Sequence, residues 1–181
     1  MNVCESCVLR LFNPDHYNMS GTGNPYSGLC IIVPSVDNQA YKKGDFAYST
    51  QVKIIKDVLS SIGEVDVFIV PLVRCKDAEG HHAANLVYGR CMKYFAMDLQ
   101  NWQFRHILVL GDAAQHLLHW DVTPNLNYVS ISKNQRTYAV NYAPLVKTTD
   151  KAKFEVFKYY LLKWYRCAKS NDFTPYNFRM L

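Results

Sequence analysis

The sequence lacks any long apolar stretch. No run approaches the ~18–20 apolar residues that a transmembrane helix needs, and no charged segment followed by an apolar one marks a signal peptide. We therefore expect a soluble intracellular protein, cytoplasmic or nucleoid-associated, with no membrane partner. Internal repeats and low-complexity tracts are also absent, so residues 1–181 are most simply one domain.

Cysteine, in contrast, is plentiful. Because disulfides are rare inside cells, six cysteines in an intracellular chain indicate metal ligation or free thiols. Two of them form Cys4-x-x-Cys7, a spacing that lets both thiols bind one centre. Cys75 ends an apolar run, and Cys91 lies in a helical pattern. We expect these four thiols to ligate one metal centre; the alternative is four small buried hydrophobic side chains.

The spacing of the four ligands bears on the metal. Structural zinc usually uses two local pairs of ligands, whereas only one pair is local here, which favours an iron–sulfur cluster of the [4Fe-4S] type; zinc stays the alternative. Cys30 lies inside an apolar run and Cys167 near the end of a predicted helix. A small hydrophobic side chain suffices at both positions, so neither is expected to bind metal.

Apolar runs and helical patterns alternate along the chain. Strands are predicted at 29–33, 65–73 and 107–110, weaker strands at 128–132 and 137–142, and helices at 49–61, 84–100, 113–120 and 148–169, with a polar loop at 34–46. This alternation predicts a three-layer α/β/α fold with a central, mostly parallel sheet. In such folds ligands bind outside the carboxyl ends of the strands, here at residues 34–39, 71–75, 111–115 and 143–147.

Several of these features together resemble the iron–sulfur uracil-DNA glycosylases, called family 4. The features are Cys4-x-x-Cys7, the strand ending in Val73-Arg74-Cys75, fifteen residues to Cys91, Tyr94, and Ile107–Leu110 followed by Gly111-Asp112-Ala113-Ala114. The resemblance spans nearly the whole chain. It implies a uracil-DNA-glycosylase-like fold in which Cys4, Cys7, Cys75 and Cys91 hold a [4Fe-4S] cluster.

The departures from the family fall where its chemistry lies. The family's first motif carries a glutamate implicated in water activation, but this chain has Val33-Pro34-Ser35-Val36-Asp37-Asn38 there. Pro71 stands where the family has a uracil-reading asparagine. Ala143 replaces a histidine that stabilises developing charge, and Leu145 replaces a serine. Excision of a flipped uracil needs such polar groups, so their joint loss predicts that uracil excision has gone.

Two classes of function follow. The first is an iron–sulfur DNA-binding or protein-scaffolding factor in DNA replication or repair. The second is an active DNA glycosylase for uracil or another modified base, with a pocket rebuilt around Asp37, Asn38 and Asn141; the simpler interpretation of Asp37 is an Asx turn after a strand. A structural zinc protein with no nucleic-acid role is a third interpretation.

Basic residues cluster near the expected cleft. The net charge is +5, and lysines interleave with aromatic residues in the last fifth of the chain. We expect Lys147 and Lys151, extended by Lys42 and Lys43, to contact DNA phosphates. The alternative is that these lysines only solvate the surface of a helix.

Overall fold

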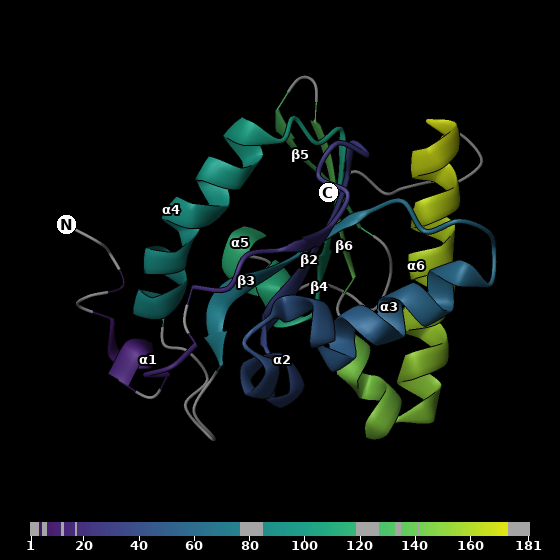
Figure 1. Ribbon diagram of the computed structural model, residues 1–181. Helices are drawn as coiled ribbons and strands as arrows, with labels where there is room; N and C mark the ends of the chain where they lie inside the picture. Colours follow the sequence, from purple (N-terminus) through teal and green to yellow (C-terminus); the bar gives the residue numbers. More distant parts are fainter. Residues whose placement is uncertain are drawn as a thin grey trace.

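A six-stranded sheet with helices on both faces organises the part of the chain that the structure describes (Figure 1). This computed structural model describes residues 4, 7–11, 13–16, 18–76, 85–118, 127–132, 135–140 and 142–173. The strands are β1 (Thr22–Gly23), β2 (Leu29–Val36), β3 (Phe68–Lys76), β4 (His106–Leu110), β5 (Asn127–Ser132) and β6 (Gln135–Val140). The helices are α1 (Val8–Leu11), α2 (Asn38–Lys43), α3 (Thr50–Ser60), α4 (Asn85–Asn101), α5 (Asp112–Leu118) and α6 (Lys151–Ser170), with 3₁₀ helices η2 (Phe46–Tyr48) and η3 (Pro144–Thr148).

The sheet is mostly parallel, as predicted. Its order is β1-β3-β2-β4-β6-β5. The four central strands pair in parallel, whereas the two outer strands, β1 and β5, pair antiparallel with their neighbours. After β2 the chain adds β3 on one side of β2, and it later adds β4 on the other side of β2. The point where the strand order reverses therefore lies between β2 and β4.

Two hydrophobic cores, one on each face of the sheet, make the three layers. Along β2, Leu29, Ile31 and Val33 pack into the core shared with α3 and α6. The alternate residues Cys30 and Ile32 pack into the core shared with α4 and α5. Since side chains alternate along a strand, a continuous apolar run here means burial on both faces. The predicted α/β/α layering is confirmed.

The predicted loop at 34–46 is wrong. β2 continues to Val36, and α2 follows at once from Asn38 to Lys43. The helix starts at the capping residue Asp37 and ends at Gly44, whose φ of 68° is the left-handed conformation that favours glycine. Only one residue of α2, Ala40, is buried, so six residues gave no helical periodicity to detect.

Other element boundaries differ by a few residues. β3 starts at Phe68 rather than 65 and runs on to Lys76, so Cys75 lies within the strand. The long C-terminal helix starts at Lys151, and the residues just before it form η3. Within the described ranges, no helix has the length and apolar character needed to cross a membrane.

Candidate metal centre

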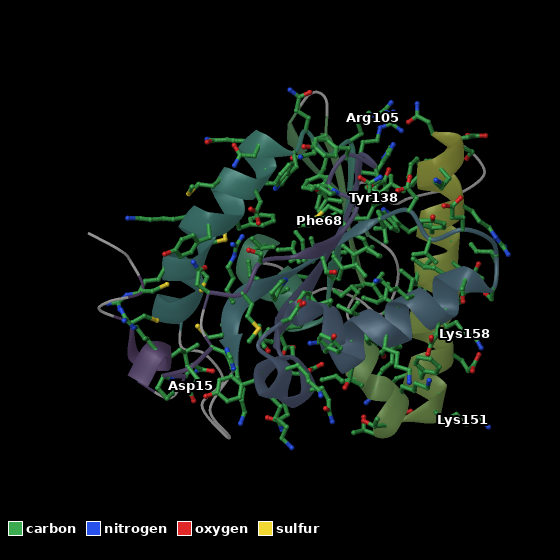
Figure 2. The ribbon with its side chains drawn as sticks, viewed as in Figure 1. Asp15, Phe68, Arg105, Tyr138, Lys151 and Lys158 are labelled. Atoms are coloured by element: carbon green, nitrogen blue, oxygen red, sulfur yellow. The ribbon has the colours of Figure 1, made fainter. Side chains whose placement is uncertain are left out.

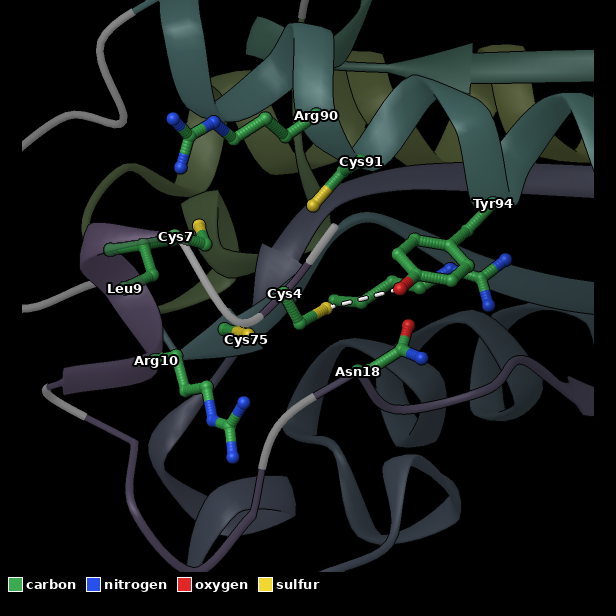
Figure 3. A pocket seen from close by; sticks show the side chains of 10 residues that line it. Cys4, Cys7, Leu9, Arg10, Asn18, Cys75, Arg90, Cys91 and Tyr94 are labelled. Atoms are coloured by element: carbon green, nitrogen blue, oxygen red, sulfur yellow. Dashed lines mark hydrogen bonds between the residues drawn. The ribbon is translucent and has the colours of Figure 1, made fainter. Parts of the chain in front are cut away.

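The four cysteines singled out in the sequence lie around one pocket (Figure 3). Cys4 and Cys7 come from the segment before α1, Cys75 from β3 and Cys91 from α4. All four are buried, with 5–8% of each residue exposed. Residues that are up to 87 positions apart in the sequence therefore converge on one place. The other two cysteines, Cys30 and Cys167, are buried in the cores and do not line this pocket.

Asn13 fastens the N-terminal segment to the sheet. Its side-chain amide donates to the carbonyl oxygens of Leu9 (2.6 Å) and Lys76 (2.9 Å), and its Oδ1 accepts from the backbone N–H of Lys76 (3.1 Å). The residue is 1% exposed. Lys76 directly follows Cys75, so these bonds hold the segment that carries Cys7 beside the strand that carries Cys75. Sequence reasoning missed Asn13, because Asn13-Pro14 looked like an ordinary turn.

The thiols themselves receive hydrogen bonds. The backbone N–H of Asn18 donates to Cys75, and the backbone N–H of Arg74 donates to Cys91. The Tyr94 hydroxyl lies 3.3 Å from the sulfur of Cys4. Asn18 has a φ of 53°, a left-handed conformation that asparagine adopts more readily than most residues. Donors aimed at sulfur stabilise thiolates, and they tune the potential of iron–sulfur clusters.

Burial has the largest effect on the pKa values of Cys75 and Cys91. Burial first, and then the nearby thiols of Cys91, Cys4 and Cys7, raise the pKa of Cys75 to about 11, although the Asn18 hydrogen bond lowers it. Burial also raises the pKa of Cys91. In the protein without metal, both thiols are therefore protonated at neutral pH, and metal binding must release their protons.

Arginines surround the thiols. Arg10, Arg74 and Arg90 all line the pocket. The Arg74 guanidinium forms an ion pair with Asp98 and lies 5.3 Å from the centre of the Tyr94 ring. Burial raises the pKa of Asp98, an effect that Arg74 opposes. Of the three, Arg74 lowers the pKa of Cys91, so its positive charge favours the thiolate there.

The donors of this pocket are four thiols. A zinc ion needs its thiolate sulfurs about 2.3 Å from one point. Among the described residues, no three His, Cys, Asp or Glu side chains are placed to hold one metal ion. Four thiols without a histidine or carboxylate are a donor set that both [4Fe-4S] clusters and structural zinc sites use. The donor chemistry of the pocket fits a [4Fe-4S] cluster.

Asp37, a candidate for water activation in the sequence, is fully hydrogen-bonded. Its Oδ1 accepts from the backbone N–H groups of Gln39 (3.1 Å) and Ala40 (3.0 Å). Its Oδ2 accepts from the Ser49 hydroxyl (2.7 Å) and the Gln51 N–H (3.2 Å). The Asx turn expected at this position is present, and the carboxylate also joins the starts of α2 and α3. A carboxylate has about four acceptor sites, and all four are in use.

The structure does not place the other two candidates, Asn38 and Asn141, in one site with Asp37. Asn38 is exposed in the first turn of α2. Asn141 lies outside the described residues. At the end of β4, a Cβ atom placed on Gly111 would lie 2.8 Å from the Cβ of Ala143, so the segments after β4 and β6 touch there. No residue of 34–39 or 143–147 lines the pocket of the four cysteines, and none lines a second cavity at the other end of the strands.

The four lysines proposed for DNA contact are exposed at the carboxyl end of the parallel strands. Lys42 and Lys43 end α2, Lys147 lies in η3 and Lys151 starts α6. Figure 1 shows α2 and the start of α6 at the side toward which the β3 arrow points. Within the described ranges, no ion pair uses any of the four.

Two other lysines of α6 form ion pairs. Lys158, labelled with Lys151 in Figure 2, pairs with Glu155 at 2.7 Å. Lys169 pairs with Asp66 at 3.5 Å. Lys147 also has a neighbour, since its Nζ lies 5.7 Å from the centre of the Phe154 ring. Within the described residues, Lys151 therefore has no ion pair that would compete with a phosphate, unlike Lys153, Lys158 and Lys169.

No model of a known protein family matches the chain, and no curated protein matches its sequence. The resemblance to the uracil-DNA glycosylases thus rests on the motif residues themselves.

Proposed function

We propose that this protein is an iron–sulfur protein in which Cys4, Cys7, Cys75 and Cys91 hold one [4Fe-4S] cluster. The observation that carries the proposal is the convergence of these four thiols, from three separate segments, on one buried pocket. When bound, the cluster supplies a covalent cross-link between the segments and a centre able to exchange one electron.

The protein's own groups favour such a centre. The N–H groups of Asn18 and Arg74 donate to two of the sulfurs, and the Tyr94 hydroxyl contacts a third. Arg74, one of the arginines that line the pocket, lowers the pKa of Cys91. Each effect lowers the cost of holding deprotonated cysteines in a buried site.

Metal analysis tests this proposal. Protein purified without oxygen should be brown and contain about four irons and four acid-labile sulfides per chain. Cys75→Ser should remove the iron, whereas Cys167→Ala, a matched change of a buried cysteine outside the pocket, should retain it. One zinc per chain without iron would overturn the cluster.

We further propose that the chain is a degenerate member of the uracil-DNA glycosylase superfamily that binds DNA or scaffolds other proteins in replication or repair. The cysteine motifs and the three-layer α/β fold support the membership. The loss of uracil excision is supported by the apolar residues that stand where the family has polar catalytic residues. Pro71 is buried in β3 beside Val33, and Ala143 packs closely against Gly111.

The alternative of an active glycosylase has less support. Its best candidate for positioning water, Asp37, already accepts four hydrogen bonds. Incubation of the cluster-loaded protein with duplexes that contain uracil, hypoxanthine or modified pyrimidines decides between the two functions. We expect no abasic sites on any duplex; an abasic product that disappears in Asp37→Asn would establish the enzyme.

A further inference from the structure

A second cavity lies at the opposite end of the strands from Cys75. It has a volume of about 210 Å³ and forms where β2 and β4 begin and α6 ends. Its lining includes Arg105, His106, Lys169 and Asn171. The volume is below the ~300–1,000 Å³ that is typical of pockets for drug-sized ligands. The cavity suits a small polar group rather than a nucleobase with its sugar.

Arginine side chains without acidic partners mark this region. In the described part of the chain, no carboxylate forms an ion pair with Arg105 or with Arg136. Arg105 lies over the backbone at Gly28, where an added Cβ would be 3.4 Å from its Nε. Arg136 lies beside His106 on the neighbouring strand, and both arginines lower the pKa of His106, after the larger effect of burial.

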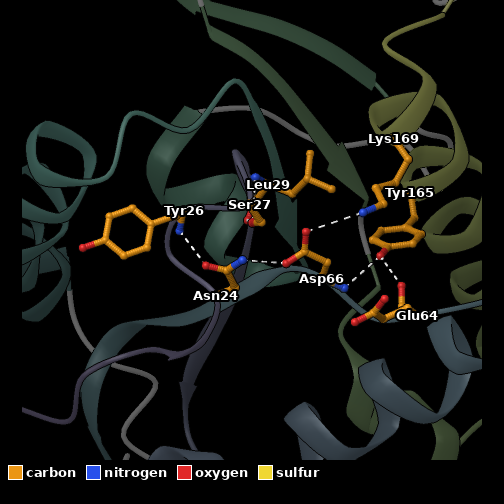
Figure 4. Close-up of polar contacts among 8 residues, drawn as sticks. All are labelled: Asn24, Tyr26, Ser27, Leu29, Glu64, Asp66, Tyr165 and Lys169. Carbon is orange, nitrogen blue, oxygen red and sulfur yellow. Dashed lines mark hydrogen bonds and ion pairs between the residues drawn. The ribbon is translucent and has the colours of Figure 1, made fainter.

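Lys169 adds a third cation, which is partly compensated. Its Nζ lies 3.5 Å from Asp66, whose other oxygen accepts from the side chain of Asn24 at 2.8 Å (Figure 4). Arg105 and Lys169 thus bring two positive charges to the cavity, and Asp66 is paired with one of them; Arg136 lies next to the cavity but does not line it. Asp172 follows Asn171 but does not line the cavity. The C-terminus of α6 contributes about half a negative charge, which is less than the full charge of Arg105.

Asn171 supplies neutral donors. It ends α6 with a φ of 52°, a position where glycine is the usual residue. Its Oδ1 lies 3.1 Å from Nε2 of His106, and with that nitrogen as the donor the Asn171 NH₂ group is left to donate elsewhere. In the described residues this NH₂ has no hydrogen-bond partner. An asparagine at this position thus adds donor groups to a cationic cavity.

We propose that this cavity binds a phosphate dianion, either inorganic phosphate or the terminal phosphate of a small phosphomonoester. Arginine suits phosphate because its planar guanidinium donates two parallel hydrogen bonds. The cations of the cavity attract a dianion more strongly than the single charge of a phosphodiester. The inference uses none of the cysteines and does not depend on the function proposed above.

Titration of the cluster-loaded, ¹⁵N-labelled protein with inorganic phosphate tests the site, with sodium chloride at matched ionic strength as the control. We expect saturable shifts of the amide signals of Gly28, Arg105 and His106. Arg105→Gln and Lys169→Gln should each weaken binding about tenfold, since each removes a charge-assisted hydrogen bond. Lys158→Gln, on the same helix, should bind as the wild type does, and Arg105→Lys should bind with intermediate affinity.

Further ligands distinguish the source of the phosphate. A nucleoside 5′-monophosphate that binds as tightly as inorganic phosphate supports a phosphomonoester ligand, whereas binding of inorganic phosphate alone supports the free ion. Dimethyl phosphate should bind at least tenfold more weakly than either. Equal binding of this diester, absence of saturable shifts, or shifts unchanged in Arg105→Gln with melting temperatures intact would each overturn the proposal.

Discussion

Replacing Cys75 with serine tests whether the proposed cluster holds the fold together. The segment from Cys7 to Cys75 spans 68 residues, and cross-linking its ends restrains the unfolded chain. The relation used for covalent cross-links gives about 4 kcal/mol for a loop of this length. A domain of this size loses about 2–4 °C of melting temperature per kcal/mol, so we expect Cys75→Ser to melt about 10 °C lower than the wild type.

The variant should still fold. Asn13 ties the N-terminal segment to Lys76 through two hydrogen bonds and makes a third to Leu9, and neither Asn13 nor Lys76 is a proposed ligand. Each such bond contributes about 1 kcal/mol. Melting should be followed by circular dichroism without oxygen, with iron measured on the same samples. The matched control is Cys167→Ala, which should keep its iron and lose no more than about 1–2 kcal/mol.

Two results would refute this reasoning. If Cys75→Ser keeps its iron, then Cys75 is not a ligand. If it loses its iron and melts at the wild-type temperature, then the cluster does not stabilise the fold.

Three further predictions concern other parts of the chain. Lys147→Ala combined with Lys151→Ala should weaken duplex binding and lower the slope of log affinity against log salt concentration by about 1.8, because each phosphate contact contributes about 0.9. Lys158→Ala should change neither the affinity nor the slope. If a mobility-shift titration at two salt concentrations finds the double variant unchanged, scaffolding is left as the function. Burial lowers the pKa of His106 below its ordinary 6.5, so just below that pH the unfolded state binds more protons than the folded state, and stability should fall as the pH drops. The free energy of urea unfolding between pH 7.5 and 5.5 should depend less on pH in His106→Gln than in the wild type. Equal pH dependence in both proteins would exclude His106 as the cause. Asp37→Ala should lose about 2 kcal/mol in urea unfolding because α2 loses its cap and the start of α3 loses the bonds that Asp37 accepts from Ser49 and Gln51. Asp37→Asn should lose less than half of that, and equal losses would argue against capping.

Local patterns predicted much of the fold. The apolar runs at 29–33 and 107–110 are buried on both faces of the sheet, and this burial is why they could be recognised as central strands. The convergence of Cys4 and Cys7 with Cys75 and Cys91 was also predicted, because a shared metal centre is the simplest use of such a set.

Pairwise contacts between distant residues were not predictable in this way. Asp37 gave only the signal of an acid after a strand; its contacts with Ser49 and Gln51, twelve and fourteen residues further on, exist only in the folded chain. The same holds for Asn13 and Lys76, which are 63 residues apart. The cavity beside Arg105 combines the starts of two strands with the end of a helix, and no short motif encodes that combination.

The hydrogen bonds of Asn13 also bear on the order of biosynthesis. Cys4 and Cys7 leave the ribosome well before Cys75, and Lys76 follows Cys75 directly. The N-terminal segment can therefore dock only once β3 has been made, and docking brings two cysteine-bearing segments together while Cys91 is still to be translated. For a cluster held by all four thiols, this order places iron delivery late. An iron carrier would meet a site that the nascent chain has already formed from the first three cysteines, and α4, which carries Cys91, would then complete the site.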